Sequence, residues 1–315
     1  MGRYLLRRIV SLAPTLVIVS LLIFTLIHLI PGDPARVMLG DRATEQDVER
    51  LREELGFDRP LYIQYINWVK GIFRGDFGRS VFIRESMVDI IGSHMAPTIV
   101  LTFYALLIAV AAAIPLGIIA AGRHNEAAGN LIEIFAMAGV SIPSFLLGLL
   151  MIIVFAVKLR WFPAAGYKTI DEVGFWPHLR YMHMPAAALG CMQAGFLIRM
   201  TRASVLEVLS SDYIRLVHAK GLDDFRIIFK HVLRNALIPI VTTLGQSLML
   251  LLSGAAVVES VFNIPGIGQL IIHAVARRDY EIIQAVVLLA TIINVAVGLT
   301  VDVLYAIIDP RVRLE

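Results

Sequence analysis

The chain has 315 residues, of which 58% are hydrophobic and 17% are charged, and its formal net charge is +3. Soluble domains carry about 25% charged residues, so this composition is typical of a membrane protein and argues against a soluble enzyme. The small net charge gives no indication of nucleic-acid binding, and we interpret the basic residues as charges that orient membrane helices. A single cysteine, Cys191, excludes an internal disulfide bond.

The apolar residues lie in blocks of about 20 residues, the length that an α-helix needs to cross a bilayer core. The first block, residues 9–30, is too long for the apolar part of a typical signal peptide, so we interpret it as an uncleaved membrane helix that follows residues 1–8. The other spans are expected at residues 98–121, 133–157, 184–200, 237–258 and 283–307. The expected fold class is therefore all-α, a polytopic membrane protein with six transmembrane helices. The span at 184–200 is the weakest, because it is short and contains Gln193.

Lysine and arginine in the short loops predict the orientation of the spans, because these residues collect on the cytoplasmic side. With the N-terminus inside, 13 of them lie in inside segments and 6 in the short outside loops. Both termini, including residues 308–315, are then cytoplasmic. Two hydrophilic segments are longer than plain turns: residues 31–97 are expected outside and residues 201–236 inside. Within the first, residues 45–55 are charged and helix-prone, and residues 61–69 have the apolar spacing of a helix that can lie on the membrane surface.

The local chemistry of residues 210–239 predicts two helices separated by a stop. Gly221 suits the left-handed position that ends a helix, Asp212 is expected to cap the first helix, and Asp223 or Asp224 the second. The apolar sides are expected to consist of Tyr213, Leu216 and Val217 in the first helix, and of Phe225, Ile228, Phe229 and Val232 in the second. A short amphipathic helix between two spans either lies on lipid or docks into a partner protein, and the mixed charges here favour a protein.

Short motifs follow one another along the chain, each of them weak alone and specific in combination. They are Pro31-Gly32-Asp33-Pro34-Ala35, Leu55-Gly56-Phe57-Asp58-Arg59-Pro60-Leu61, Gly75-Asp76-Phe77-Gly78, Ser141-Ile142-Pro143-Ser144-Phe145, Ala219-Lys220-Gly221-Leu222 with Leu233-Arg234-Asn235-Ala236-Leu237-Ile238-Pro239, Phe262-Asn263-Ile264-Pro265-Gly266-Ile267-Gly268, Arg278-Asp279-Tyr280, and Asp302-Val303-Leu304-Tyr305-Ala306 with Asp309-Pro310-Arg311. Over essentially its whole length the chain thus resembles the dipeptide/oligopeptide permease family, the transmembrane (type-1) subunits of bacterial ABC importers. The pair of motifs around residues 219–239 is similar to the EAA loop of these permeases, with Arg215, Leu216 and Val217 in place of Glu-Ala-Ala.

The resemblance implies the type-1 ABC importer transmembrane fold, with its domain at residues 95–304, in the bacterial inner membrane and in contact with lipid. It also implies three kinds of protein partner: a second homologous permease subunit, two ABC ATPase subunits, and an extracytoplasmic solute-binding protein that delivers di- or oligopeptides. ATP and Mg²⁺ would bind to the ATPase subunits, and this chain would hold no cofactor. The residues implied to couple the permease to an ATPase are Asp212, Tyr213, Arg215, Leu216, Ala219, Lys220, Gly221, Leu222 and Asp223.

No Gly-x4-Gly-Lys-Ser/Thr sequence is present, so the chain has no phosphate-binding loop of its own, and no catalytic residue is assigned. The polar residues Gln193, Gln246 and Asn294 lie in expected spans and are candidates for the translocation path, with helix–helix hydrogen bonding as an equal alternative. His178 and His183 share one expected outside loop, but their spacing is irregular and we predict no metal site. Nickel chelates, glutathione or another small solute are the alternative cargo. A secondary transporter or channel is the alternative class, which mid-membrane acids or an inverted repeat would favour.

Overall fold

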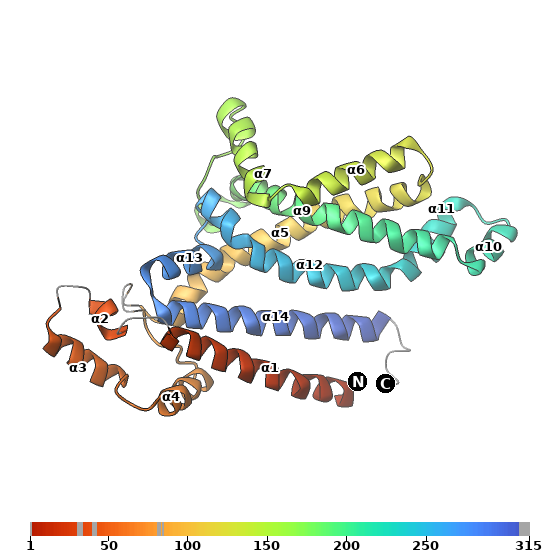
Figure 1. The fold of residues 1–315 in the computed structure, drawn as a ribbon. Coiled ribbons are helices and arrows are strands. Elements are labelled where there is room, and N and C mark those ends of the chain that lie inside the picture. The colour runs from red at the N-terminus through yellow and green to blue at the C-terminus, as the bar shows by residue number, and fades with distance from the viewer. Residues whose placement is uncertain (1, 30–33, 40–42, 81–82, 84, 309–315) are drawn as a thin grey trace. The chain divides into compact units, whose positions relative to one another are not determined.

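The computed structural model describes residues 2–29, 34–39, 43–80, 83 and 85–308 (Figure 1). Within these ranges the secondary structure is helical, apart from one isolated bridge between Arg79 and Ser86, so the all-α prediction is confirmed. Residues 31–33 of the first motif and residues 309–315, which include most of the predicted C-terminal tail, lie outside the described residues. The described residues divide into two compact units, one formed by residues 97–268 and 296–308 and the other drawn from residues 2–96 and 269–295.

Three helices in the described residues are long and apolar enough to cross a bilayer. They are Met87–Gly122, Ile227–Phe262 and Tyr280–Val303, which contain or overlap the predicted spans at 98–121, 237–258 and 283–307. The first predicted span lies in α1 (Gly2–Leu29), where the apolar stretch found among the described residues is Ala13–Thr25. The total of six spans therefore stays a prediction.

The predicted span at 133–157 is divided by a sharp break. It consists of α6 (Ala127–Ser141), α7 (Ser144–Met151) and the π-helix η1 (Ile152–Lys158), with a bend of 99° between α6 and the helix that follows. Ile142 is extended (φ −88°, ψ 121°), because a residue before proline disfavours the helical conformation, and Pro143 lacks the N–H that would continue the helix.

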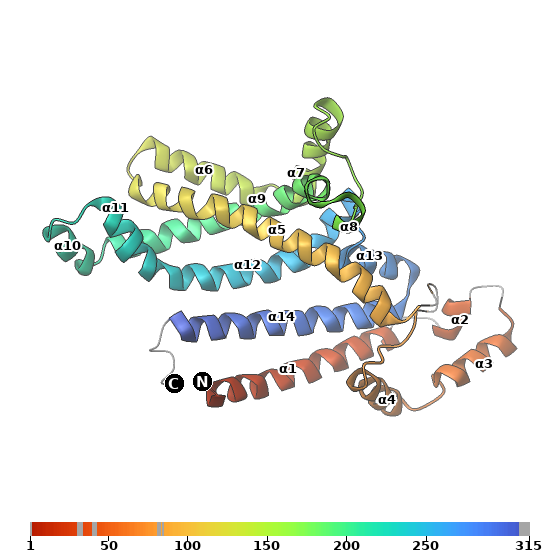
Figure 2. The same ribbon diagram turned by 180° about the vertical axis from the view of Figure 1, so that it is seen from behind.

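Helix α9 (Phe175–Leu209) is the central helix of the unit formed by residues 97–268 and 296–308. It lies between α6 and α12 (Leu233–Phe262) in Figure 1, and α5 (Met87–Gly122) runs alongside it in Figure 2. Glycines bring the backbones close: a Cβ on Gly195 would lie 2.4 Å from the carbonyl oxygen of Ala136 in α6, and one on Gly190 would lie 2.8 Å from that of Ala105 in α5. Small residues at such crossings let membrane helices approach each other.

The central position of α9 explains why the weakest predicted span, at residues 184–200, can contain Gln193. Most of its residues are buried by neighbouring helices, so protein surrounds them in place of lipid. Gln193, whose amide would be costly in hydrocarbon, donates a hydrogen bond from Nε2 to Ser247 Oγ of α12 at 2.5 Å. A buried helix of this kind does not need to be apolar all round.

The unit formed by residues 2–96 and 269–295 begins with α1 and the short helix α2 (Pro34–Leu39). Helix α3 (Glu45–Leu55) has the bounds that the sequence predicted. It starts with a capping box, in which the Thr44 side chain accepts from the N–H of Asp47 and the Asp47 side chain accepts from the N–H of Thr44. It ends at Gly56, whose φ of 69° is left-handed.

Helix α4 (Leu61–Phe73) forms where the apolar spacing predicted a helix, and it packs on α1 in the same unit. The hydroxyls of Ser20 and Tyr65 lie 2.9 Å apart, and the rings of Phe24 and Tyr65 meet edge to face at 5.4 Å. Leu61 and Tyr62 are exposed, as expected of a helix whose outer side contacts the membrane surface. Its position on the membrane surface stays a prediction.

The first part of α14 (Tyr280–Ile308) lies in this unit, follows α13 (Ile267–Arg277) and is capped by Asp279. Asp279 Oδ1 accepts from the backbone N–H of Ile282 at 3.3 Å, and Asp279 Oδ2 accepts from the hydroxyl of Ser80 at 2.6 Å. Both side chains are buried. This pair fixes the segment before α5 to the start of α14.

Candidate functional site

The segment between α9 and α12 folds into a helix, a stop and a second helix, as predicted. The first helix, α10 (Asp212–Ala219), begins after Ser211, whose extended backbone makes it the N-cap, so the prediction that Asp212 caps the helix is wrong. Asp212 instead lies in the first turn, where a carboxylate interacts favourably with the helix dipole, and its Oδ1 is 3.1 Å from Arg215 Nη1. The stop is Gly221, whose φ of 78° is left-handed as predicted.

The second helix continues into a membrane span. It runs from α11 (Asp224–Arg226) through the π-helix η2 (Ile227–Val232) into α12 without a gap. Asp223 Oδ2 accepts from the backbone N–H of Arg226 at 3.2 Å, which is the hydrogen bond expected of a cap. The segment after Gly221 therefore forms one continuous helix with α12, so that a movement of its start can be passed on to α12.

The buried side of α10 differs from the predicted one. Ile214 and Val217 face inward and belong to an apolar cluster with Val205 of α9, Ile227 of η2 and Ala236 of α12. Of the predicted apolar residues of α10, Val217 is therefore buried, whereas Tyr213 and Leu216 point outward with 49% and 57% of their surface exposed. Helix α10 therefore has two apolar faces. The sequence pattern alone does not show which of them packs against the rest of the chain.

Four apolar side chains of the segment point outward and are not covered by the rest of the chain. We call them the outer apolar set: Tyr213, Leu216, Phe225 and Phe229. All four are about half exposed or more, and the rings of Phe225 and Phe229 are 4.5 Å apart. Exposed charged side chains accompany them, namely Asp212, Arg215, Lys220, Asp223 and Arg226. Apolar residues with a charged rim are typical of a surface that binds another protein. Of the other predicted coupling residues, Ala219 and Gly221 are exposed and Leu222 is partly buried against the cluster around Ile214.

One hydrogen bond joins the two helices of the segment directly. The hydroxyl of Tyr213 in α10 lies 2.7 Å from Nδ1 of His231 in η2. Their rings meet edge to face, with centroids 5.9 Å apart. The sequence analysis missed this pair, because 18 residues and a turn separate its members and leave no local periodic signal.

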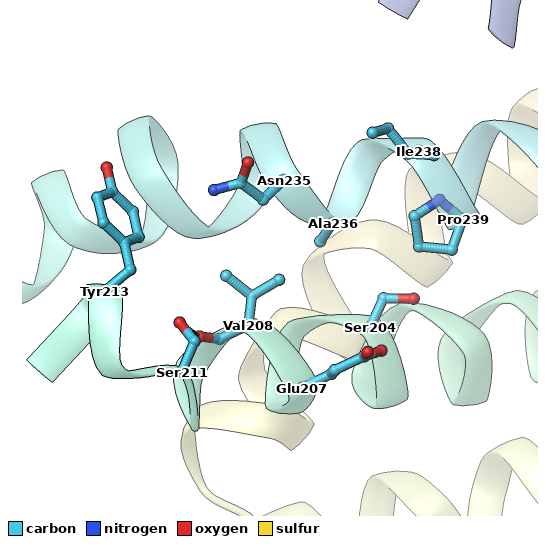
Figure 3. Close-up of a pocket in the computed structure, with 9 residues that line it drawn as sticks. All are labelled: Ser204, Glu207, Val208, Ser211, Tyr213, Asn235, Ala236, Ile238 and Pro239. Carbon is cyan, nitrogen blue, oxygen red and sulfur yellow. Dashed lines mark hydrogen bonds between the residues drawn. The ribbon is translucent and has the colours of Figure 1, made fainter. Parts of the chain in front are cut away.

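A cavity of about 480 Å³ opens beside the start of α10 (Figure 3). Figure 3 shows Val208 of α9 pointing toward the ribbon of α12, and Tyr213 of α10 at one end of the cavity. Asn235 of α12 also lines it and donates from Nδ2 to the carbonyl oxygen of His231 at 2.9 Å. The full lining consists of Ser204, Glu207, Val208, Ser211, Tyr213, Asn235, Ala236, Ile238 and Pro239.

The three polar residues predicted as path candidates have different surroundings. Gln193 is buried and hydrogen-bonded to Ser247 between α9 and α12. Gln246 is exposed on α12, one residue before Ser247 and on a different face of the helix. Asn294 is half-buried in α14. Within this single chain, Gln246 is the candidate whose side chain stays accessible.

The sequence analysis overlooked a buried acid, Glu259, near the end of α12. Its carboxylate is fully buried and accepts a hydrogen bond from the Thr98 hydroxyl at 2.6 Å. The same Thr98 oxygen accepts from the backbone N–H of Ile267 at 2.8 Å, and a Cβ on Gly266 would lie 2.3 Å from the Glu259 carboxylate. The available signal was that Glu259 is the sole acid between residues 233 and 262. The predicted span ends at Val258, one residue before Glu259.

The histidines of the loop considered for a metal site have structural partners. Nδ1 of His178 lies 2.6 Å from the carbonyl oxygen of Lys168, and Nδ1 of His183 lies 2.7 Å from the hydroxyl of Tyr104. Among the described residues, no group of three or more histidine, cysteine, aspartate or glutamate side chains is arranged to hold a metal ion.

Comparison with known families gives two matches that together cover most of the chain. Residues 113–314 match the model of the binding-protein-dependent transport system inner membrane component, and residues 1–102 match the model of the N-terminal part of such components. A probable peptide ABC transporter permease protein, y4tP, of Sinorhizobium fredii is 40% identical over 99% of this chain and 100% of its own length. The glutathione transport system permease protein GsiC of Escherichia coli K12 is 42% identical over the full length of both chains.

Solved structures share the fold at low sequence identity. A chain of the inward-facing MetNI methionine ABC transporter matches with a TM-score of 0.59 at 19% identity, over 71% of this chain and 98% of its own. A chain of an amino acid ABC transporter, solved with histidines, matches with a TM-score of 0.51 at 14% identity, over 69% of this chain and 94% of its own. These similarities support the predicted type-1 importer fold.

Proposed function

The chain belongs to the family of binding-protein-dependent transport system inner membrane components, the permease subunits of ABC importers, and we propose that its cargo is a short peptide. One full-length relative is named for peptide transport and another for glutathione transport, and glutathione is itself a small peptide. Di- and oligopeptides delivered by a solute-binding protein are therefore the proposed substrates. Nickel chelates and other small solutes are the alternative cargo.

The segment around α10 is the observation that supports a coupling role. Tyr213, Leu216, Phe225 and Phe229 leave apolar surface uncovered at the end of the bundle that holds α10. A short helix with an outer apolar face suits docking into a groove of another protein. Because the chain has no phosphate-binding loop, we propose that this groove belongs to a separate ABC ATPase, which binds ATP and Mg²⁺.

The proposed machine contains this permease, a second homologous permease, two ATPase subunits and a solute-binding protein. Both termini and α10 lie in the cytoplasm in this arrangement, as the charges of the short loops predict. The ATPases move α10 when they close on ATP, and the continuous path from α11 through η2 transmits that movement to α12. Nucleotide then shifts the population between outward- and inward-facing states, because the two states differ in how they bind the ATPases.

The experiment that tests this proposal places a charge in the outer apolar set. Leu216→Asp should abolish co-purification of the ATPase subunits from membranes, because a carboxylate would be desolvated in the docking groove. Ile170→Asp is the matched control, since Ile170 is a similarly exposed residue of α8 (Ile170–Val173), outside the coupling segment. Retention of the ATPases by the Leu216 variant would contradict the docking proposal.

The cargo is tested separately with the intact complex in proteoliposomes. Uptake of a labelled dipeptide should depend on ATP and on the solute-binding protein, and unlabelled oligopeptides should compete with it. If glutathione or a nickel chelate is taken up and dipeptides do not compete, the proposed substrate is wrong while the permease assignment stands.

A further inference from the structure

One face of α12 carries a row of polar side chains that the rest of its unit leaves uncovered. Asn235, Thr242, Gln246, Ser253 and Ser260 follow at intervals of 7, 4, 7 and 7 residues. At about 100° per residue these intervals keep all five within a stripe about 40° wide. Thr242 is half-buried and the other four are exposed, with the apolar residues Leu250 and Val257 interleaved along the edge.

Helices α5 and α6 of the same unit show the opposite pattern. Every exposed side chain of α5 between residues 97 and 122 is apolar, including Phe103 at 58% and Leu107 at 63% exposure. In α6 the exposed side chains between residues 131 and 140 are also apolar, with Phe135 at 69%. Such faces suit lipid. An uncovered stripe of amide and hydroxyl groups does not, because polar groups in membrane spans face a bundle interior or an aqueous path.

The stripe is long enough to cross the membrane, and it ends at the cavity. From Thr242 to Ser260 the helix rises about 27 Å, close to the roughly 30 Å of a bilayer core. Asn235 lies seven residues before Thr242, toward the N-terminal end of α12. Together with Glu207 of α9 it lines the 480 Å³ cavity beside α10. The polar stripe and the cavity are therefore successive parts of one surface.

From this continuity we propose that the α12 stripe lines the translocation path, that the cavity is its cytoplasmic mouth, and that Gln246 is a specificity-determining residue in it. The inference rests on the proposed permease function and deepens it. Gln246 is about three turns from Asn235 and two from Ser253, and it lies about 6 Å along the helix from Thr242. Its side chain is exposed and forms no hydrogen bond with the other described residues.

The hydrogen-bond donors and acceptors that the stripe leaves free indicate which class of solute it can bind. The hydroxyls of Thr242, Ser253 and Ser260 donate to their own helix, at the carbonyl oxygens of Ile238, Met249 and Ala256 respectively. Their protons are thus already used, and what they present to the path is acceptor lone pairs. Gln246 adds both a donor and an acceptor. A row of uncharged acceptors matches a solute with several N–H donors, as a peptide backbone and its terminal ammonium group provide.

Cysteine accessibility in the complete complex tests the placement of the stripe. In a Cys191→Ala background, single cysteines replace Thr242, Gln246, Ser253 or Ser260, and Phe103 or Leu107 serves as the matched lipid-facing control. A cationic methanethiosulfonate reagent needs a hydrated thiolate, so it should modify the four stripe positions and leave both α5 positions unmodified. A saturating dipeptide cargo should slow the reaction at residue 246.

A second variant tests the chemical role of the amide. Gln246→Leu keeps the side-chain size and removes its hydrogen bonds, so peptide uptake should fall by roughly two- to tenfold, the effect of losing one hydrogen bond. The variant should still retain the ATPase subunits on purification. Leu250→Met on the same face is the control and should transport normally.

Two results would overturn the inference. The first is that the cysteines in the stripe stay unmodified in a complex that transports. If they also form disulfides with the second permease, the stripe is a subunit interface. The second is unchanged peptide uptake by Gln246→Leu. Both leave the permease assignment intact, which fails only if the assembled complex does not retain its ATPases or transports nothing.

Discussion

Thr98 and Glu259 lie 161 residues apart in the sequence and are joined by a buried hydrogen bond of 2.6 Å. The bond ties the early part of α5 to the last turn of α12. Thr98 also accepts from the N–H of Ile267, so the same hydroxyl holds the first residue of α13. The turn between α12 and α13 is therefore fixed through a side chain of a third helix.

Removing the Thr98 hydroxyl should destabilise the protein. Thr98→Val takes one hydrogen bond from a buried carboxylate and one acceptor from the Ile267 N–H, and we expect a loss of about 2–4 kcal/mol. The matched control is Thr102→Val, one turn further along α5, because the buried Thr102 hydroxyl makes no hydrogen bond among the described residues. That change should be neutral or stabilising. Thermal unfolding of both variants in the same detergent measures the difference, and equal stabilities would refute the role of this bond.

Gly266 should be similarly intolerant of a side chain. A Cβ there would lie 2.3 Å from the Glu259 carboxylate, so Gly266→Ala must displace a buried group, at a cost of about 1–3 kcal/mol or more. Gly254→Ala in α12 is the control, because no atom lies within 4 Å of its Cβ position. Alanine in a helix interior should stabilise that variant slightly. The yield of folded protein and the midpoint of thermal unfolding distinguish the two, and a well-folded Gly266→Ala would count against this packing.

The orientation of the chain follows from charge and needs a direct measurement. In a Cys191→Ala background, a membrane-impermeant thiol reagent applied to intact cells should label cysteines at Pro60 and Glu172 but not at Asp223. All three residues are exposed in the structure, so accessibility within the chain does not distinguish them. Labelling at position 223 from outside would reverse the proposed topology and remove α10 from the cytoplasm.

Local signals made part of this structure predictable. The bounds of α3 and the left-handed conformation of Gly221 follow from residues within a few positions, and the structure has both. The break at Pro143 was visible as a proline, but its 99° bend depends on packing that a sequence pattern does not report. The inward face of α10 and the partners of Glu259 depend on residues that the fold brings together from far apart. A single sequence carries no periodic signal for such contacts.

The hydrogen bond between Tyr213 and His231 should transmit the position of α10 to η2. Tyr213→Phe keeps the outer ring for docking and removes the hydroxyl, and His231→Phe keeps a ring and removes the nitrogen that lies 2.7 Å from that hydroxyl. We expect either variant to retain the ATPases while cargo-stimulated ATP hydrolysis falls by roughly two- to tenfold. The double variant should be no worse than the more severe single variant, because both remove the same interaction. Additive losses would show that the two residues act independently.

Substitutions at Gly221 can distinguish the cost of backbone strain from the effect of contact with a partner subunit. Its φ is 78°, and no atom of the chain lies within 4 Å of the position that a Cβ would take. A side chain there meets no steric obstacle, and the left-handed conformation costs roughly 1 kcal/mol. Asparagine visits this conformation more readily than most residues, so Gly221→Asn should fold and couple nearly normally.

Gly221→Asp has almost the same shape as Gly221→Asn and adds a negative charge. On a free surface that charge would change little, whereas against an ATPase it would be desolvated, so cargo-stimulated hydrolysis and uptake should be lost while membrane insertion is retained. Gly75→Asp is the matched control, since Gly75 also has a φ of 78° and open space around it, in the segment expected outside the cell. Uptake and ATPase co-purification of the three variants decide the question. Normal transport by Gly221→Asp would place the ATPase contact elsewhere, because a charge at this position would then meet only water.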